Sequence, residues 1–139
     1  MDYKSVLKEI GKGKVAPVYL CYGPEKYTMR QFVESVCGAL VEPEQKDMAV
    51  VRYDLAETSL EGVIEDAETL PFLVSRKIVI ASGAAFFFTG SKDTSKVEHR
   101  IDKLAEYLKA PVDYSVIIFT VDAEKLDERK KNREIAEGS

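Results

Sequence analysis

Pro17-Val18-Tyr19-Leu20-Cys21-Tyr22 is a nearly continuous apolar run, and Gly23-Pro24 turns the chain directly after it. A run without apolar–polar alternation is typical of a parallel strand that is covered on both faces. Three further runs have the same composition and are expected to be strands: residues 48–53, 77–81 and 115–120. These four runs set the fold class.

Helical patterns separate the four runs. Apolar residues recur at three- and four-residue spacing in residues 3–11, 25–41 and 95–109, and in a segment that opens at Leu60. The helix at 95–109 is expected to bury Val97, Ile101, Leu104, Ala105 and Leu108. We interpret Thr58-Ser59-Leu60-Glu61 as a capping box, in which Glu61 at the third helical position returns a hydrogen bond. Strands that alternate with helices predict an α/β fold, a parallel sheet with helices on both faces.

Composition favours a single domain. The length of 139 residues suits one domain. A net charge of -4 and a pI near 5.2 argue against binding of nucleic acid by this chain alone, although basic residues cluster at positions 125–133. No apolar run approaches the roughly 18 residues of a membrane span, and no signal-peptide pattern opens the chain. We therefore expect a cytoplasmic location and no membrane partner.

We expect two parts along the chain. Residues 1–126 form the α/β domain, and residues 127–139 are the start of a following segment that is cut short, or an added tail. The second part begins as a charged helix and stops at Glu137-Gly138-Ser139.

The connection Leu70-Pro71-Phe72-Leu73-Val74-Ser75 is more apolar than a connection usually is. We call residues 70–75 the knob. Continuing the preceding helix at 100° per residue places Phe72 and Leu73 off its buried stripe of Leu60, Val63, Ile64 and Ala67. Pro71 disfavours helix at Leu70 and suits the first position of a new helical turn. The pattern predicts an exposed apolar knob, and the alternative is core packing between helix and strand.

The turn after the first strand is where ligands usually bind in such sheets. A P-loop requires GxxxxGK[ST], because successive backbone N–H groups wrap a phosphate and the lysine reaches it. Here Gly23, Lys26 and Thr28 supply the first glycine and isolated polar residues, without the second glycine or the Lys-[Ser/Thr] pair in register. Pro24 removes a donor and Glu25 adds negative charge. We expect a degenerate P-loop without nucleotide binding, and an active P-loop-type nucleotide-binding or NTPase module is the alternative.

Other reactive residues are better explained by structure. Cys21 and Cys37 lack a CxxC partner and are expected to be reduced core thiols. His99 is the only histidine, so a metal site or a histidine-based triad has almost no residues to use. We expect no metal.

Acidic and aromatic residues near strand ends have simple interpretations too. Asp54 is expected to be a polar strand terminus or turn residue, since the partner carboxylates of a phospho-acceptor site are missing. Asp122, Glu124 and Asp127 are expected to form a charged loop and helix start, because a magnesium-binding Walker B pair needs an intact P-loop. We expect two of residues 86–88, all Phe, to pack under the sheet edge.

Several segments, taken in order, resemble the delta subunit of the bacterial DNA polymerase III clamp loader. The matching segments are residues 17–27 with its "PVYLLYGEE-Y" opening, residues 54–60, residues 67–72 leading into 75–77, residues 104–111 with its "L-x-x-Y-L-x-x-P" helix end, and residues 116–119 and 126–131 with its "VLVF…LDKRKK" segment. The resemblance spans essentially the whole chain, and the order and spacing of the motifs make it specific.

The resemblance implies an AAA+-like N-terminal domain that neither binds nor hydrolyses ATP, needs no cofactor and has no catalysis of its own. It implies binding to the beta sliding clamp through a Leu-Phe hydrophobic wedge, which promotes opening of the ring. Aligned through Ser75-Arg76, the wedge falls on Phe72 and Leu73 in reversed order, Pro71 stands where the family has a serine, and Leu70 shares the role. The full-length protein would also contact the ATPase subunits and delta prime, and DNA only within the full complex.

Overall fold

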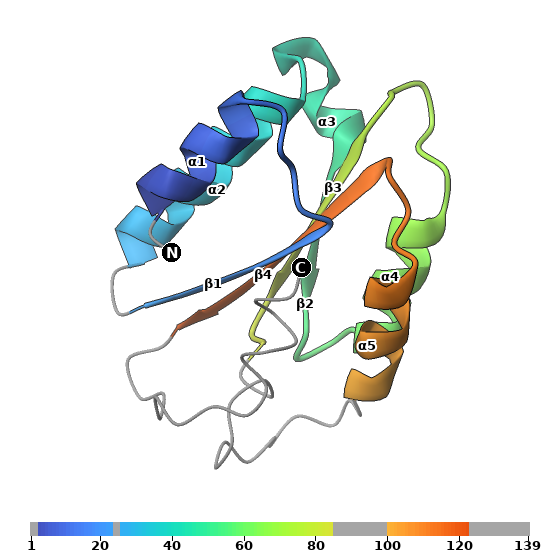
Figure 1. The fold of residues 1–139 in the computed structure, drawn as a ribbon. Coiled ribbons are helices and arrows are strands. Elements are labelled where there is room, and N and C mark those ends of the chain that lie inside the picture. Colours follow the sequence, from blue (N-terminus) through green and yellow to red (C-terminus); the bar gives the residue numbers. More distant parts are fainter. Residues whose placement is uncertain (1–2, 24–25, 85–99, 123–139) are drawn as a thin grey trace.

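The computed structural model describes residues 3–23, 26–84 and 100–122 (Figure 1). Four strands form one sheet: β1 (Val18–Gly23), β2 (Val50–Asp54), β3 (Lys77–Ser82) and β4 (Ser115–Asp122). Their order is β1-β4-β3-β2, and every neighbouring pair is parallel. The predicted α/β fold is confirmed.

Helices cover both faces of this sheet. α1 (Tyr3–Gly11) and α2 (Lys26–Leu40) lie on one face, and α4 (Leu60–Glu68) and α5 (Ile101–Lys109) lie on the other (Figure 1). The short helices η1 (Pro43–Gln45) and α3 (Lys46–Ala49) lead into β2. The strand predicted from residue 48 therefore begins only at Val50, because helical turns occupy the preceding residues.

Side chains on the two central strands alternate between two hydrophobic clusters. Ile78, Ile80 and Ile118 belong to the cluster under α1 and α2. Val79 and Phe119 belong to the cluster under α4 and α5. This arrangement explains why the strands are apolar at successive positions, since both faces of the sheet are covered.

The helices follow the predicted stripes, with one difference in burial and one in capping. All four stripe residues of α4 are buried, but α5 buries Leu104 and Tyr107, of which Tyr107 lies outside its predicted stripe. The N-cap of α4 is Ser59, whose hydroxyl accepts a hydrogen bond from the Gly62 N–H at 3.1 Å. The third helical position is thus Gly62, which has no side chain to return a bond. The predicted capping box, with Glu61 in that role, was wrong by one residue.

The two predicted sites lie at opposite edges of the sheet. Because the strands are parallel, β1 ends at Gly23 on the carboxyl edge, where the turn to α2 begins. The connection from α4 enters β3 at Lys77, on the amino edge. A ligand in the turn and a partner on the knob would therefore not share a surface (Figure 1).

Some predictions fall outside the described residues: residues 86–88, His99, the first part of the helix predicted at 95–109, and the basic and charged segments after residue 122. None of the helices that the structure describes combines the length and apolarity of a bilayer span.

Candidate functional site

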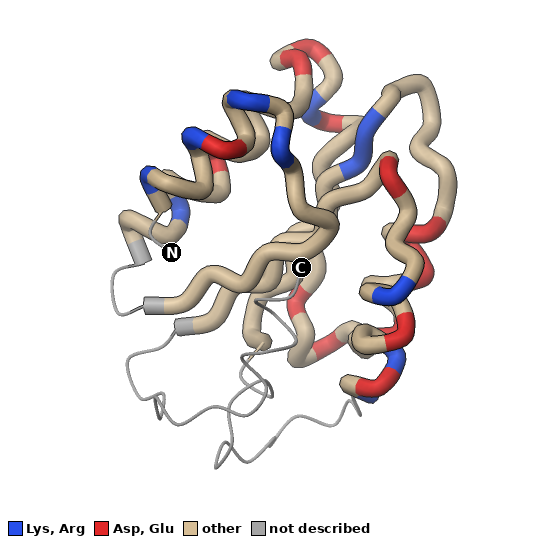
Figure 2. The backbone as a smooth tube through the Cα atoms, viewed as in Figure 1, with Lys and Arg blue, Asp and Glu red and all other residues tan. Residues whose placement is uncertain are grey.

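The connection between α4 and β3 exposes three large apolar side chains. Leu70, Phe72 and Leu73 are 74%, 76% and 68% exposed. Across the described parts of the chain, only Tyr27 and Met48 are other large hydrophobic residues with comparable exposure. The knob was predicted to be exposed, and the structure confirms that these three side chains are exposed. They do not pack into the core between helix and strand, as the alternative required. Figure 2 shows that this connection carries no charge between Glu68 and Arg76.

The backbone of the knob is irregular. Residues 69–76 contain bends and no helix, so the helical turn suggested by Pro71 does not form. Leu73 has a φ of 64°, and among the described residues no other non-glycine residue has a positive φ. A right-handed helical turn cannot pass through such a residue, because it needs a negative φ. Leucine rarely adopts this left-handed conformation, and such outliers concentrate at functional sites.

One residue of the knob packs against the core, and a second is half-buried. Val74 packs against the cluster under α1 and α2, and Pro71 is half-buried. The exposed side chains at 70, 72 and 73 therefore belong to a segment with its own contacts to the core.

A buried lysine lies at the base of the knob. The Lys77 ammonium donates hydrogen bonds to Asp66 Oδ1 at 2.7 Å, to the Asp66 carbonyl at 2.8 Å and to the Thr69 carbonyl at 3.0 Å. Lys77 is only 7% exposed. A buried cation needs such partners, since an unpaired charge in the interior is very costly. Lys77 thus ties the end of α4 to the start of β3.

Neighbouring groups complete this anchor. The Tyr114 hydroxyl donates to the Glu68 carbonyl, and Ser115 Oγ donates to the Ala67 carbonyl at 2.6 Å. The Thr69 hydroxyl donates to the Glu65 carbonyl at 2.8 Å. A helix end leaves its last carbonyls without partners inside the helix. Side chains of β3, of β4, of the residue just before β4 and of the C-cap supply those partners here.

The charges at the anchor shift two pKa values. Burial raises the pKa of Asp66, but the hydrogen bonds from Lys77 and Tyr53 outweigh burial and hold that pKa below its ordinary value. The bond that the Tyr53 hydroxyl donates to Asp66, together with burial, raises the pKa of Tyr53 to about 12. Asp66 is therefore an anion and Tyr53 a neutral donor at neutral pH.

Sequence reasoning located the apolar side chains of the knob but not this anchor. Asp66, Lys77, Tyr114 and Ser115 are distant in sequence and meet only through the sheet. One signal was available: Lys77 opens a strand that is otherwise apolar, and a lysine there needs partners when both faces are covered.

The degenerate P-loop position is described only in part. Gly23 ends β1, Lys26 begins α2, and Thr28 is exposed in the first turn of α2, while residues 24 and 25 lie outside the described chain. These residues stay a sequence-based prediction of a turn that does not bind nucleotide.

Other predicted residues have local roles. Asp54 Oδ1 accepts the Ala56 N–H at 2.9 Å, which is the turn role expected for it. Cys21 and Cys37 are buried free thiols, and burial raises the pKa of Cys21 to about 12. Within the described residues, no group of His, Cys, Asp and Glu side chains could hold a metal ion.

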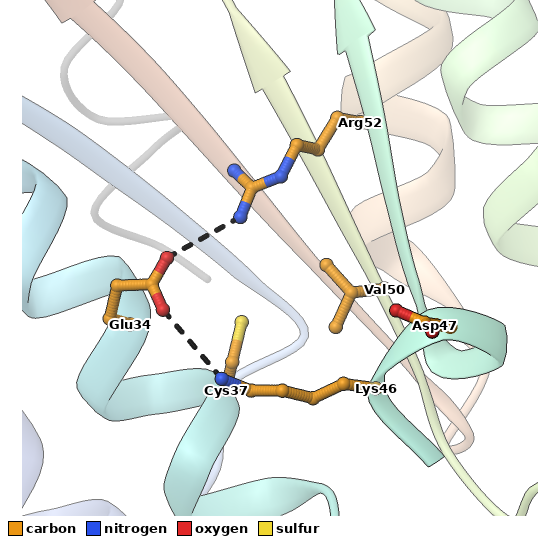
Figure 3. A pocket seen from close by; sticks show the side chains of 6 residues that line it. All are labelled: Glu34, Cys37, Lys46, Asp47, Val50 and Arg52. Atoms are coloured by element: carbon orange, nitrogen blue, oxygen red, sulfur yellow. Dashed lines mark ion pairs between the residues drawn. The ribbon is translucent and has the colours of Figure 1, made fainter. Parts of the chain in front are cut away.

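The described residues line two hollows that bear on the choice of site. One, of about 240 Å³, lies between α2, α3 and β2, where Glu34 pairs with Lys46 at 3.7 Å and with Arg52 at 3.5 Å (Figure 3). The other, of about 470 Å³, lies between α4 and α5 and is lined mainly by glutamates. The ion pairs in the first hollow are well exposed and therefore weak. Both hollows are less distinctive than the knob.

Comparisons with known proteins agree on one family. The family model described as "DNA polymerase III, delta subunit" matches residues 19–137. The chain is 40% identical over 126 residues to DNA polymerase III subunit delta of Bacillus subtilis (strain 168), covering 91% of this chain and 36% of that protein. The chain therefore spans little more than a third of that relative's length.

Solved structures give the same result. The Bacillus subtilis DNA clamp loader delta protein superposes with a TM-score of 0.82 at 36% identity, over 98% of this chain and 40% of that one. A DNA polymerase III gamma subunit-related protein of Thermotoga maritima has a TM-score of 0.58 at 18% identity, over 88% of this chain and 40% of that one. The second likeness concerns the fold alone.

Proposed function

Because the chain belongs to the DNA polymerase III delta subunit family, we propose that it is a non-catalytic domain that binds the beta sliding clamp. The contact would be made by Leu70, Phe72 and Leu73, which would enter an apolar pocket on the clamp as a hydrophobic wedge. The single observation that carries the proposal is the exposure of these three side chains on one anchored, uncharged connection.

The energetics of the knob suit this role. Burying a side chain of the size of Phe or Leu contributes about 1.5–3 kcal/mol each. That free energy is not used within this domain, because the three side chains remain in water. Large apolar anchors that fill a partner's pocket are typical of binding hot spots.

Ring opening would follow from differential binding. If the knob binds a clamp with one strained or open interface more tightly than a closed clamp, binding shifts the clamp toward the open form. No nucleotide is needed for this step, since the driving force is the difference in affinity. We place hydrolysis of ATP in the ATPase subunits of the full loader, and contacts with those subunits, delta prime and DNA in the assembled complex.

The experiment is a direct binding measurement. Phe72→Asp combined with Leu73→Asp should lower the affinity for the clamp of the same organism at least about 100-fold, since each hot-spot residue contributes about 2 kcal/mol or more. Tyr27→Asp is the control for an added negative charge: it places one aspartate on an exposed aromatic residue of α2, near the opposite edge of the sheet, where the test variant places two in the knob. Circular dichroism checks folding of all variants.

Two results would count against the proposal. Absence of clamp binding by the wild-type chain would remove its basis. A folded double variant that binds as tightly as the wild type would show that another surface makes the contact.

A further inference from the structure

The knob is fixed at both of its ends by one residue. The Lys77 side chain holds the carbonyls of Asp66 and Thr69, directly before Leu70, where the chain leaves α4. The Lys77 backbone N–H donates to the Tyr114 carbonyl at 2.8 Å, where the chain enters the sheet. The segments just before and just after the knob are thus both hydrogen-bonded through Lys77, at the start of β3.

The surrounding groups make this point rigid. The carbonyls of Ala67 and Glu68 are bound by Ser115 and Tyr114, so four consecutive carbonyls, from residue 66 to residue 69, accept bonds from side chains of β3, of β4 or of the residue just before β4. The direction in which Leu70 leaves α4 is therefore set by the sheet.

We propose that Lys77 is a positioning residue for partner binding: its buried ammonium fixes the exit of α4 and so holds Leu70 and Phe72 in the orientation that a partner's apolar pocket accepts. The inference rests on the proposed function of the knob. Lys77 is itself buried, so it acts through the knob and makes no contact with the partner.

This role has a kinetic signature. Without the anchor, the knob would sample several orientations, and only the competent fraction could bind, so the apparent affinity falls by that fraction. Association slows in proportion, whereas dissociation is unchanged because the bound contacts are the same. A residue that touches the partner behaves differently, since losing its contacts mainly speeds dissociation.

The test compares Lys77→Met with Phe72→Ala and with Lys103→Met. Lys103→Met makes the same chemical change on the surface of α5, where Lys103 has a single ion pair with Glu106 at 3.9 Å. Two quantities are measured on the 139-residue chain. One is hydrogen exchange of the Thr69 amide, which donates to the Glu65 and Asp66 carbonyls directly before the knob. The other is the pair of rates of association with and dissociation from the clamp of the same organism.

Lys77→Met should speed exchange of the Thr69 amide about tenfold or more and slow association about tenfold, with dissociation within about twofold of wild type. Phe72→Ala should speed dissociation instead, and Lys103→Met should change neither quantity. If Lys77→Met does not fold, Asp66→Asn replaces it, since this change weakens the same anchor while both carbonyls keep their bonds. Asp66→Asn should shift both quantities in the same directions by a smaller factor.

Two outcomes would overturn the inference. Unchanged exchange and association in the folded variant would show that the knob is oriented without Lys77. Exchange that rises equally at Thr69 and in the strands would show that Lys77 contributes to stability only. If the wild type fails to bind the clamp, the proposed function fails, and the exchange measurement alone decides whether Lys77 orders the exit of α4 from which the knob begins.

Discussion

Leu73 combines an unfavourable backbone with an exposed apolar side chain. Its φ of 64° costs roughly 1–2 kcal/mol for leucine, and asparagine adopts this conformation more readily. Leu73→Asn should therefore leave the free energy of unfolding unchanged or raise it by up to about 1 kcal/mol. The same variant should bind the clamp about 30-fold less tightly or worse, as expected for the loss of a hot-spot side chain. Urea unfolding and a binding titration measure the two effects.

Leu70→Asn is the matched control for this prediction. Leu70 is equally exposed but has no positive φ, so the change removes apolar surface without relieving the backbone. Two results would contradict the idea that leucine is kept at residue 73 for binding. One is a gain in stability in both variants. The other is no gain in either variant, with Leu73→Asn binding the clamp as tightly as the wild type.

Asp66 gives the anchor a pH dependence. Its pKa is below the ordinary 3.8 in the folded chain, so its contribution to stability is present above that value and is lost as the pH falls through the folded-state pKa. Asp66→Asn should lower the free energy of unfolding by about 1–3 kcal/mol at pH 7. The difference from wild type should shrink below about pH 4. Urea unfolding between pH 3 and pH 7 measures it, and a difference that stays constant over this range would contradict the prediction.

At the scale of elements, α4 has two ends with different roles. Its first turn is capped by Ser59, and its last turn is held by the anchor that precedes the knob. Ser59→Ala should lower the free energy of unfolding by about 1 kcal/mol. Ser59→Asp should keep the free energy of unfolding close to that of the wild type, since aspartate is also a good N-cap. Clamp affinity should stay within about twofold for both variants at a temperature where they are folded. A large loss of affinity in Ser59→Ala would mean that the first turn also orients the knob.

The strands were predictable because burial on both faces leaves a continuous apolar run, as in β3 and β4. The start of β2 was not, because η1 and α3 are too short for a helical period to appear in the sequence. The register of the cap of α4 was also ambiguous, since Thr58 and Ser59 are both good N-caps and only the structure shows which one is used.

The exposed side chains of the knob were predictable because the helical period places Phe72 and Leu73 away from the core. Its backbone was not: Pro71 suggested a helical turn, and the left-handed Leu73 excludes one. The anchor depends on Lys77 meeting Asp66 and Thr69 across eight or more residues, and such contacts are set by tertiary packing. Local sequence patterns carry little information about them.

At the scale of the whole molecule, the sheet separates the knob from the turn that follows β1. The knob lies at the amino edge, and Gly23 lies at the carboxyl edge. The two edges are at opposite ends of the strands. A molecule bound at one edge would therefore not touch a molecule bound at the other. This separation makes clamp binding and nucleotide binding independently measurable in the same chain.

The turn that follows β1 is not expected to bind ATP. ATP with magnesium at about 1 mM should leave the unfolding temperature unchanged, because the turn lacks the second glycine and the Lys-[Ser/Thr] pair of a P-loop. A site with a Kd near 10 μM would instead raise stability by about 2.7 kcal/mol at that concentration, a shift of several degrees. Clamp affinity should likewise be the same with and without ATP. A saturable, magnesium-dependent rise in unfolding temperature would favour the alternative of a nucleotide-binding module, and an ATPase of known affinity run in parallel shows that the assay detects binding.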